Sequence, residues 1–189
     1  MTSDRKKKWL SVFTAASLAM SLGVLQFSTV SAASGENAFD VPGLNALNTR
    51  GSAEVLDISC AAPGDCSAVG TYLNDDSDQV FVVSQVAGVW GTAIDVPGLK
   101  ASNIGAYADA PSISCPAPGY CSAVGTYSND SGTQGFVVSQ VDGVWGTAID
   151  MPQIIDPGFD YAESGAEIFS VSCAAPGYCT AGGIYDSDD

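Results

Sequence analysis

The apolar residues after about position 38 fall in short runs rich in Val, Ile, Tyr, Phe and Trp. Gly, Pro, Asn, Asp and Ser separate the runs, and no segment there has a convincing helical period, which is typical of β-strands. In the central region the pattern predicts strands at Pro111–Cys115, Cys121–Tyr127, Gly135–Val141 and Val144–Ile149. Asp142-Gly143 between the last two is typical of a two-residue hairpin turn of the primed type. The sequence therefore predicts an all-β fold of short antiparallel strands.

The same pattern occurs more than once along the chain. The segment Phe81–Val86 returns unchanged at Phe136–Val141, and Gly88–Asp95 returns unchanged at Gly143–Asp150, both 55 residues later. Three Cys-x5-Cys segments mark three units, of about 38–94, 95–149 and 150–189, the last of which is incomplete. A fixed period of this size indicates a propeller, a solenoid or an array.

Four antiparallel strands in about 55 residues correspond to one propeller blade. The fold prediction is therefore tandem four-stranded antiparallel blades, about 2.5 units in all, forming a partial or truncated β-propeller. Closed propellers have four to eight blades, so three interpretations remain open. The first, which we favour, is that the chain is a fragment of a longer propeller. The second is a short array that closes by oligomerising, and the third is a small open stack of sheets. An open sheet edge makes self-association possible.

The six cysteines occur as pairs at one repeated spacing, which in an exported chain is typical of three disulfides. The repeat favours pairing within each unit: Cys60 with Cys66, Cys115 with Cys121 and Cys173 with Cys179. Zinc is the alternative for clustered cysteines, but the chain has no histidine, and the common ligand knuckles have closer spacing. Each predicted bridge closes a turn that a Pro-Gly pair already bends.

The first 32 residues predict a cleaved signal peptide, followed by a short linker at 33–37. Four basic residues at Arg5–Lys8 precede a largely apolar stretch at Trp9–Phe27, and Val30-Ser-Ala32 supplies the small residues of a cleavage site. An uncleaved membrane anchor is the alternative, because the stretch is just long enough to span a bilayer. We expect a secreted, extracellular protein that has no membrane contact after the signal is removed.

The expected mature chain is strongly acidic. It keeps 20 of the 21 acidic residues but only two of the six basic residues, Arg50 and Lys100, so its net charge is −18. Such a surface repels nucleic acid and anionic lipid, which excludes both as partners. Solubility is the simplest interpretation of the charge, and cations or basic partners are the others.

Several motifs resemble the blades of secreted bacterial propellers related to the Asp-box, or sialidase-type, repeats. Ala123 and Gly125 lie where that family carries its Ala-Val-Gly strand, and Ser139–Trp145 lies where it carries the Asp-box turn. The turn here is one residue shorter than the usual box, and Ala87 replaces its Asp in the first unit. The resemblance implies a degenerate form of the repeat, and in that family the boxes lie away from the active site.

The sequence predicts no catalytic residue and no cofactor. Without histidine, the Ser–His and Cys–His nucleophile arrangements are excluded. Calcium is a low-probability alternative to ordinary solvated turns, because two predicted turns are rich in oxygen ligands. Its candidate ligands are Asp75, Asp76, Asp78 and Asp130. A glycoside hydrolase needs two opposed carboxylates. Acidic residues are so common in this chain that their presence neither supports nor excludes such an enzyme.

Trp90 and Trp145 recur at the same position and are candidates for stacking on a ligand, although core packing is the simpler interpretation. Tyr72, Tyr127 and Tyr185 are similarly ambiguous. We expect a non-enzymatic exported repeat protein that acts as a binding or interaction module for an extracellular glycan or protein. The alternative is a fragment of a propeller-type glycoside hydrolase.

Overall fold

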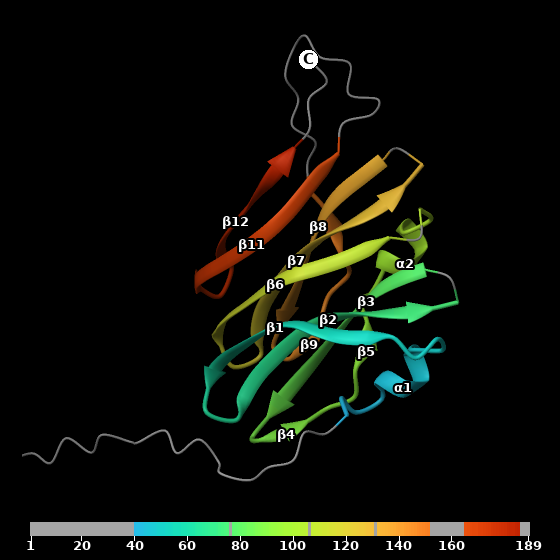
Figure 1. The fold of residues 1–189 in the computed structure, drawn as a ribbon. Coiled ribbons are helices and arrows are strands. Elements are labelled where there is room, and N and C mark those ends of the chain that lie inside the picture. Colours follow the sequence, from blue (N-terminus) through green and yellow to red (C-terminus); the bar gives the residue numbers. More distant parts are fainter. Residues whose placement is uncertain (1–39, 76, 106, 131, 152–164, 186–189) are drawn as a thin grey trace, which may run out of the picture. The chain divides into compact units, whose positions relative to one another are not determined.

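The structure is a computed structural model that describes residues 40–75, 77–105, 107–130, 132–151 and 165–185. The predicted signal peptide and linker lie outside the described residues. The described chain forms three antiparallel β-sheets that follow one another along the sequence (Figure 1). The prediction of an all-β fold of repeated antiparallel units is confirmed, and the described residues form no closed propeller.

Each of the first two sheets has three long strands and two short ones. Sheet 1 contains β1 (Ala53–Ala62), β2 (Asp65–Asn74), β3 (Ser77–Val86), β4 (Val89–Trp90) and β5 (Ile94–Asp95). Sheet 2 contains β6 (Ala108–Ala117), β7 (Tyr120–Asn129), β8 (Gly132–Val141), β9 (Val144–Trp145) and β10 (Ile149–Asp150). Sheet 3 contains β11 (Ala166–Ala175) and β12 (Tyr178–Tyr185). In sheets 1 and 2 the long strands are paired in sequence order, and both short strands pair with the third strand.

The predicted fourth strand at Val144–Ile149 is divided in the structure, so this detail of the prediction is wrong. β9 and β10 both pair with β8, but the three residues between them belong to no strand. The N–H of Gly146 donates to the carbonyl of Ser139, and the N–H of Ala148 donates to the carbonyl of Pro97 at 2.8 Å. Because Pro97 lies in the linker before sheet 2, this segment joins the two ends of one repeat.

Two four-residue helices in the linkers were not expected from the sequence. α1 (Leu44–Leu47) and α2 (Leu99–Ser102) each begin after a glycine with positive φ and end at an asparagine. A single helical turn contains too few residues to produce a helical period. Leu99 in α2 belongs to the main hydrophobic core, and the leucines of α1 pack against the smaller core of sheet 1.

A glycine in the second strand of each sheet allows the first strand to approach closely. A Cβ atom on Gly70 or Gly125 would lie 2.0 Å from the carbonyl oxygen of Glu54 or Asp109, and one on Gly183 would lie 1.9 Å from that of Glu167. No side chain fits at such a distance. This contact explains the repeated glycine, which lies beside the bulge in the first strand.

Consecutive sheets pack through the first strand of the later sheet. β6 packs against β1, β2 and β3, and β11 packs against β6, β7 and β8. Val69, Val80 and Val82 of sheet 1 share the main core with residues of sheet 2. The core of the molecule therefore lies between sheets as well as around each one.

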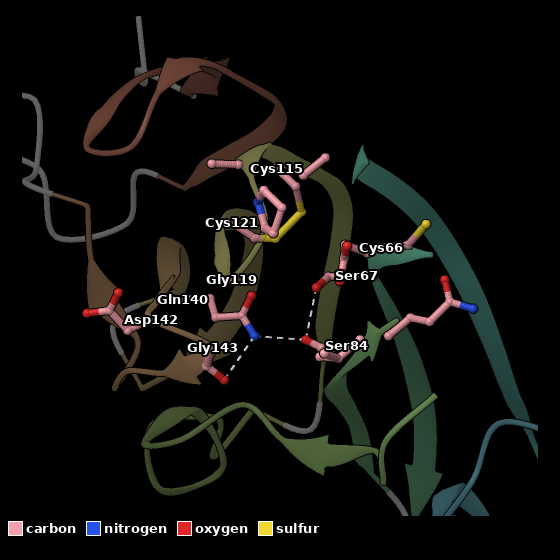
Figure 2. Close-up of a pocket in the computed structure, with 15 residues that line it drawn as sticks. Cys66, Ser67, Ser84, Cys115, Gly119, Cys121, Gln140, Asp142 and Gly143 are labelled. Carbon is pink, nitrogen blue, oxygen red and sulfur yellow. Dashed lines mark hydrogen bonds between the residues drawn. A yellow bond between two sulfur atoms is a disulfide. The ribbon is translucent and has the colours of Figure 1, made fainter. Parts of the chain in front are cut away.

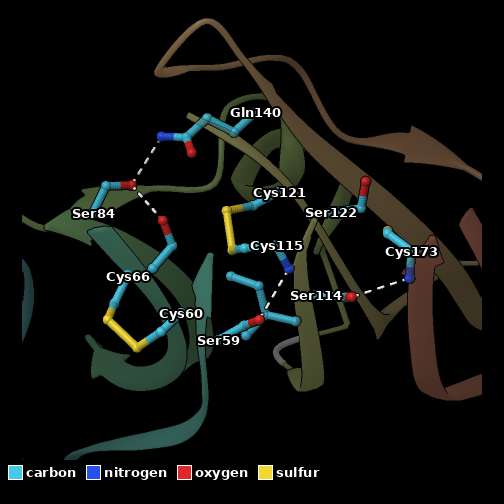
Figure 3. Close-up of a disulfide and its surroundings, with 12 residues drawn as sticks. Ser59, Cys60, Cys66, Ser84, Ser114, Cys115, Cys121, Ser122, Gln140 and Cys173 are labelled. Atoms are coloured by element: carbon cyan, nitrogen blue, oxygen red, sulfur yellow. Dashed lines mark hydrogen bonds between the residues drawn. A yellow bond between two sulfur atoms is a disulfide. The ribbon is translucent and has the colours of Figure 1, made fainter. Parts of the chain in front are cut away.

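Polar side chains on each first strand also bind the backbone of the next sheet (Figure 3). Asp57 Oδ2 and Ser59 Oγ accept hydrogen bonds from the N–H groups of Ile113 and Cys115 at 2.8 and 2.9 Å. In the same way, Ser112 and Ser114 accept from Val171 and Cys173, at 3.2 and 3.0 Å. The same two strand positions thus join sheet 1 to sheet 2 and sheet 2 to sheet 3.

Candidate binding clefts between the sheets

The three predicted disulfides are present, between Cys60 and Cys66, Cys115 and Cys121, and Cys173 and Cys179. No cysteine is free in the part of the chain that the structure describes. Each bridge joins the first two strands of its sheet directly beside the turn between them. Three disulfides in one short chain indicate an oxidising, extracytoplasmic environment.

At this end of sheets 1 and 2, the cysteine turn is bonded to the hairpin turn that follows the third strand. The N–H of Gly88 donates to the carbonyl of Gly64 at 2.8 Å, and the N–H of Gly143 donates to that of Gly119 at 2.9 Å. Asp142 and Gly143 have φ values of 50° and 81°, which confirms the predicted primed turn. The paired turns form a rim at one end of each sheet.

A cleft of about 340 Å³ opens between the rims of sheets 1 and 2 (Figure 2). Both cysteine turns and the end of β3 line it, together with residues of the β8–β9 hairpin. Asp65 contributes from sheet 1, and Gln140 and Asp142 contribute from sheet 2. The Cys115–Cys121 disulfide and Pro118 form an apolar part of its wall.

The boundary between sheets 2 and 3 carries a smaller cleft of about 80 Å³. Repeat-equivalent residues line both, since Cys121, Ser122 and Ser139 replace Cys66, Ser67 and Ser84. At the position of Asp65, however, sheet 2 has Tyr120, whose hydroxyl donates to Asp142 of the same rim. Tyr120 lines the smaller cleft.

A hydrogen-bond network centred on Ser84 forms the floor between the first two sheets (Figure 2). Gln140 Nε2 and Trp145 Nε1 of sheet 2 donate to Ser84 Oγ at 2.9 and 3.1 Å. Ser67 Oγ lies 2.9 Å from the same oxygen. Because Gln140 Nε2 also donates to the carbonyl of Gly143, both of its hydrogens are used, and only its carbonyl oxygen remains available as an acceptor.

The carboxylates in the cleft likewise offer acceptors. Asp65 Oδ1 accepts from the N–H of Ala87, and Asp142 Oδ1 accepts from Tyr120. Among the described residues, neither carboxylate has a bonded partner on its second oxygen. Gln85 donates its amide N–H to Gly88 and likewise keeps its oxygen. The side chains described above therefore offer the cleft hydrogen-bond acceptors rather than donors.

Trp145 is 9% exposed and is held between sheets 1 and 2 by its bond to Ser84. Trp90, at the same repeat position in sheet 1, is partly exposed and lines an apolar groove of about 130 Å³ with Val55 and Ile58. Stacking of either indole on a ligand stays a prediction.

The described candidate calcium ligands lie in the hairpins between the second and third strands of sheets 1 and 2. Asp75 and Asp130 are exposed in the second-to-third-strand turns of different sheets, and Asp78 is partly buried on β3. Asp76 lies outside the described residues. The carbonyl of Asp78 accepts from Asn103 Nδ2 at 2.7 Å. Within the described ranges, no three acidic or cysteine side chains are grouped as metal ligands.

Two tyrosines noted in the sequence bind aspartates of their own sheet. Tyr72 donates to Asp95, and Tyr127 donates to Asp150 at 2.8 Å. Burial, and then the bonded carboxylate, raises the pKa of Tyr72 above its ordinary value near 10, and the same causes raise the pKa of Tyr127. Asp95 and Asp150, which hold the same repeat position, thus anchor the ends of sheets 1 and 2.

Sequence reasoning did not select Asp65, Ser84, Gln140 or Asp142 as site residues. Ser84 and Gln140 belong to the Ser-Gln-Val segments that return unchanged in the repeat. Asp65 lies at a position where the three cysteine turns differ, with Asp in one and Tyr in two. Comparing the three cysteine turns for such differences would have pointed to Asp65.

Comparison with models of known protein families, with curated proteins and with solved structures finds no match. The description of the clefts therefore rests on this chain alone. None of the described helices has the length and apolar character needed to cross a membrane.

Proposed function

We propose that this chain is a non-enzymatic, exported interaction module built from propeller-like blades. Its cleft between sheets 1 and 2 binds a basic side chain of a partner protein. The observation that carries the proposal is the set of unused acceptors on Asp65, Gln85, Gln140 and Asp142 around one cleft. The three disulfides support export.

The chemistry of the acceptors favours a cationic group over a neutral one. Two aspartates, two glutamines and no Lys or Arg are among the residues that line the cleft. A guanidinium carries five N–H donors, and its bonds to carboxylates are about twice as strong as those between neutral groups. The excess of 21 acidic over six basic residues also attracts basic partners from a distance.

The difference between the two clefts supports a single principal binding position. In the smaller cleft Tyr120 replaces an acid, so its rim supplies an apolar ring where the larger cleft has the Asp65 carboxylate. With less volume and no carboxylate among its lining residues, this position is a poor match for a guanidinium. The proposal therefore assigns binding to the cleft at sheets 1 and 2.

Calorimetric titration with a short arginine-containing peptide tests this function. We expect binding that weakens with salt, and a matched citrulline peptide, which is neutral, is expected to bind at least about tenfold more weakly. Asp65→Asn and Asp142→Asn are each expected to weaken binding of the arginine peptide about tenfold. Asp130→Asn makes the same change of charge in a turn at the opposite end of sheet 2 and is expected to leave binding unchanged.

Three results would contradict the proposal. One is an equal loss of affinity in the Asp130→Asn control, since binding would then depend on total charge alone. Another is equal affinity for the arginine and citrulline peptides. The third is binding of a neutral oligosaccharide in preference to both, which would assign the cleft to glycans.

A further inference from the structure

The near face of sheet 1, which is the face that a preceding sheet would cover, is exposed. Ile58 is 53% exposed, whereas Ile113 at the same position of sheet 2 is 5% exposed, because sheet 1 covers it. Val55 is 47% exposed, and its equivalent, Ala110, is fully buried. Sheet 1 therefore exposes apolar residues whose equivalents in sheet 2 are buried in the main core.

Hydrogen bonding at this face also differs from that in sheet 2. The N–H of Ile113 donates to Asp57 of the preceding sheet. In sheet 1 the N–H of Ile58 donates instead to Oδ1 of its own neighbour, Asp57, at 2.8 Å. The backbone N–H groups of β1 thus hold the same positions as those of β6. Among the described residues, no preceding sheet supplies side-chain acceptors for them.

At the other end of the array, sheet 3 exposes the matching acceptors. Ser170 and Ser172 occupy on β11 the positions that Asp57 and Ser59 occupy on β1, in the same register to the second strand. Both serines are exposed. Thr180, beside them on β12, is also exposed, although its equivalent Ser122 is buried next to sheet 3.

We propose that the exposed face of sheet 3 binds the near face of sheet 1 of a second copy of this chain. Ser172 of one copy then accepts from the N–H of Cys60 of the other, and Ser170 replaces Asp57 Oδ1 as the acceptor for the N–H of Ile58. The apolar groove beside Trp90 is covered by the neighbouring sheet, as its equivalent is in sheet 2. This inference concerns a different surface from the cleft and does not depend on the proposed function.

A second copy would continue an interface that the chain already forms twice. Sheets 1 and 2 and sheets 2 and 3 meet through the same strand positions, with side-chain acceptors on one and backbone donors on the other. The two end faces carry the two halves of that interface. Such head-to-tail contacts are heterologous and generate either rings or open filaments.

The free edge of β12 offers a different mode of association. In sheets 1 and 2 the second strand pairs with a third, whereas β12 has no such partner among the described residues. Two copies that joined at this edge would use the same surface twice. A head-to-tail contact instead uses two different surfaces, and this difference makes the two modes separable by mutation.

The test uses sedimentation of the purified protein with one altered end at a time. Ile58→Lys places a charge on the near face of sheet 1, and Ser172→Lys places one on the exposed face of sheet 3. Each variant is expected to remain monomeric at concentrations where the unaltered protein associates, with affinity reduced at least about tenfold. An equimolar mixture is expected to form a single dimer, because each variant keeps the end that the other has lost.

Val144→Lys is the matched control, since Val144 is exposed in the β8–β9 hairpin of the middle sheet. It is expected to associate like the unaltered protein. Formation of the mixed dimer also shows that both end variants are folded. The proposal is overturned if the unaltered protein stays monomeric up to about 100 µM, well above the micromolar limit of standard interfaces. It is also overturned if either end variant still associates alone, or if the mixture remains monomeric.

Discussion

The near faces of sheets 1 and 2 have closely similar sequences but very different surroundings. Ile113 and Trp145 are buried in sheet 2 against sheet 1, whereas Ile58 is exposed and Trp90 is partly exposed in sheet 1. The strands, the disulfide and the hairpin are the same in both sheets. Burial in this fold is therefore decided by the neighbouring sheet, as expected when repeat stability comes largely from interfaces.

The largest expected effect compares the two isoleucines. Ile113→Ala is expected to lower the free energy of unfolding by about 3 kcal/mol, because it leaves a cavity between two sheets. Ile58→Ala is expected to cost less than about 1 kcal/mol, since the side chain already faces solvent in the isolated chain. Denaturant unfolding of dilute protein measures both, and equal losses would show that the two faces are buried alike.

A smaller effect is expected at the two tryptophans. Trp145→Phe removes the donor to Ser84 and is expected to cost about 1–2 kcal/mol. Trp90 makes no such bond to another sheet among the described residues, so Trp90→Phe is expected to cost less than about 0.5 kcal/mol. The same unfolding measurement applies, and a cost at Trp90 as large as that at Trp145 would contradict the comparison.

The tyrosines provide a control in which the two sheets are expected to agree, because each bond lies within one sheet. Tyr72→Phe and Tyr127→Phe are each expected to cost about 1 kcal/mol at neutral pH. The raised pKa of each tyrosine means that its contribution is complete below pH 10 and is lost as pH rises above that value. The loss of stability between about pH 10 and 11 is therefore expected to be smaller in each Phe variant, and an unchanged pH profile would contradict this assignment.

The smallest effect concerns the two hairpin turns. Ala87 has a φ of 50°, as does Asp142 at the same position, but alanine tolerates this left-handed conformation poorly. Ala87→Gly is expected to stabilise sheet 1 by about 0.5–1 kcal/mol. A rise in the denaturation midpoint checks it, and destabilisation would show that the turn is held by contacts other than backbone conformation.

Much of the fold was predictable because the repeat constrains it. Short apolar runs and the Asp142-Gly143 turn predict the three main strands of a repeat, although the observed strands are longer at their ends. Identical spacing predicts the pairing within each Cys-x5-Cys segment. The helix α2 and the division of β9 from β10 were not predictable. They depend on tertiary bonds, such as that from Ala148 to Pro97, which no local period reveals.

The candidate site was less accessible to sequence reasoning. Its residues come from two different sheets, so that Asp65 and Asp142 line one cleft only when the sheets pack. In the sequence, Ser84 is an ordinary polar residue of a strand. Its role depends on the hydrogen bonds that Gln140 and Trp145 of the next sheet donate to it. A pattern within one repeat cannot indicate contacts that form between repeats.

The most direct test of the central claim is amide hydrogen exchange at equivalent positions of two first strands, measured at low and high protein concentration. The N–H of Cys115 donates to Ser59 of the preceding sheet, so slow exchange is expected at every concentration. The N–H of Cys60 holds the same position at the exposed near face, so fast exchange is expected in dilute protein and slower exchange as copies associate. Equal, concentration-independent protection of Cys60 and Cys115 would contradict the account, because it would show that the near face of sheet 1 is already covered within a single chain.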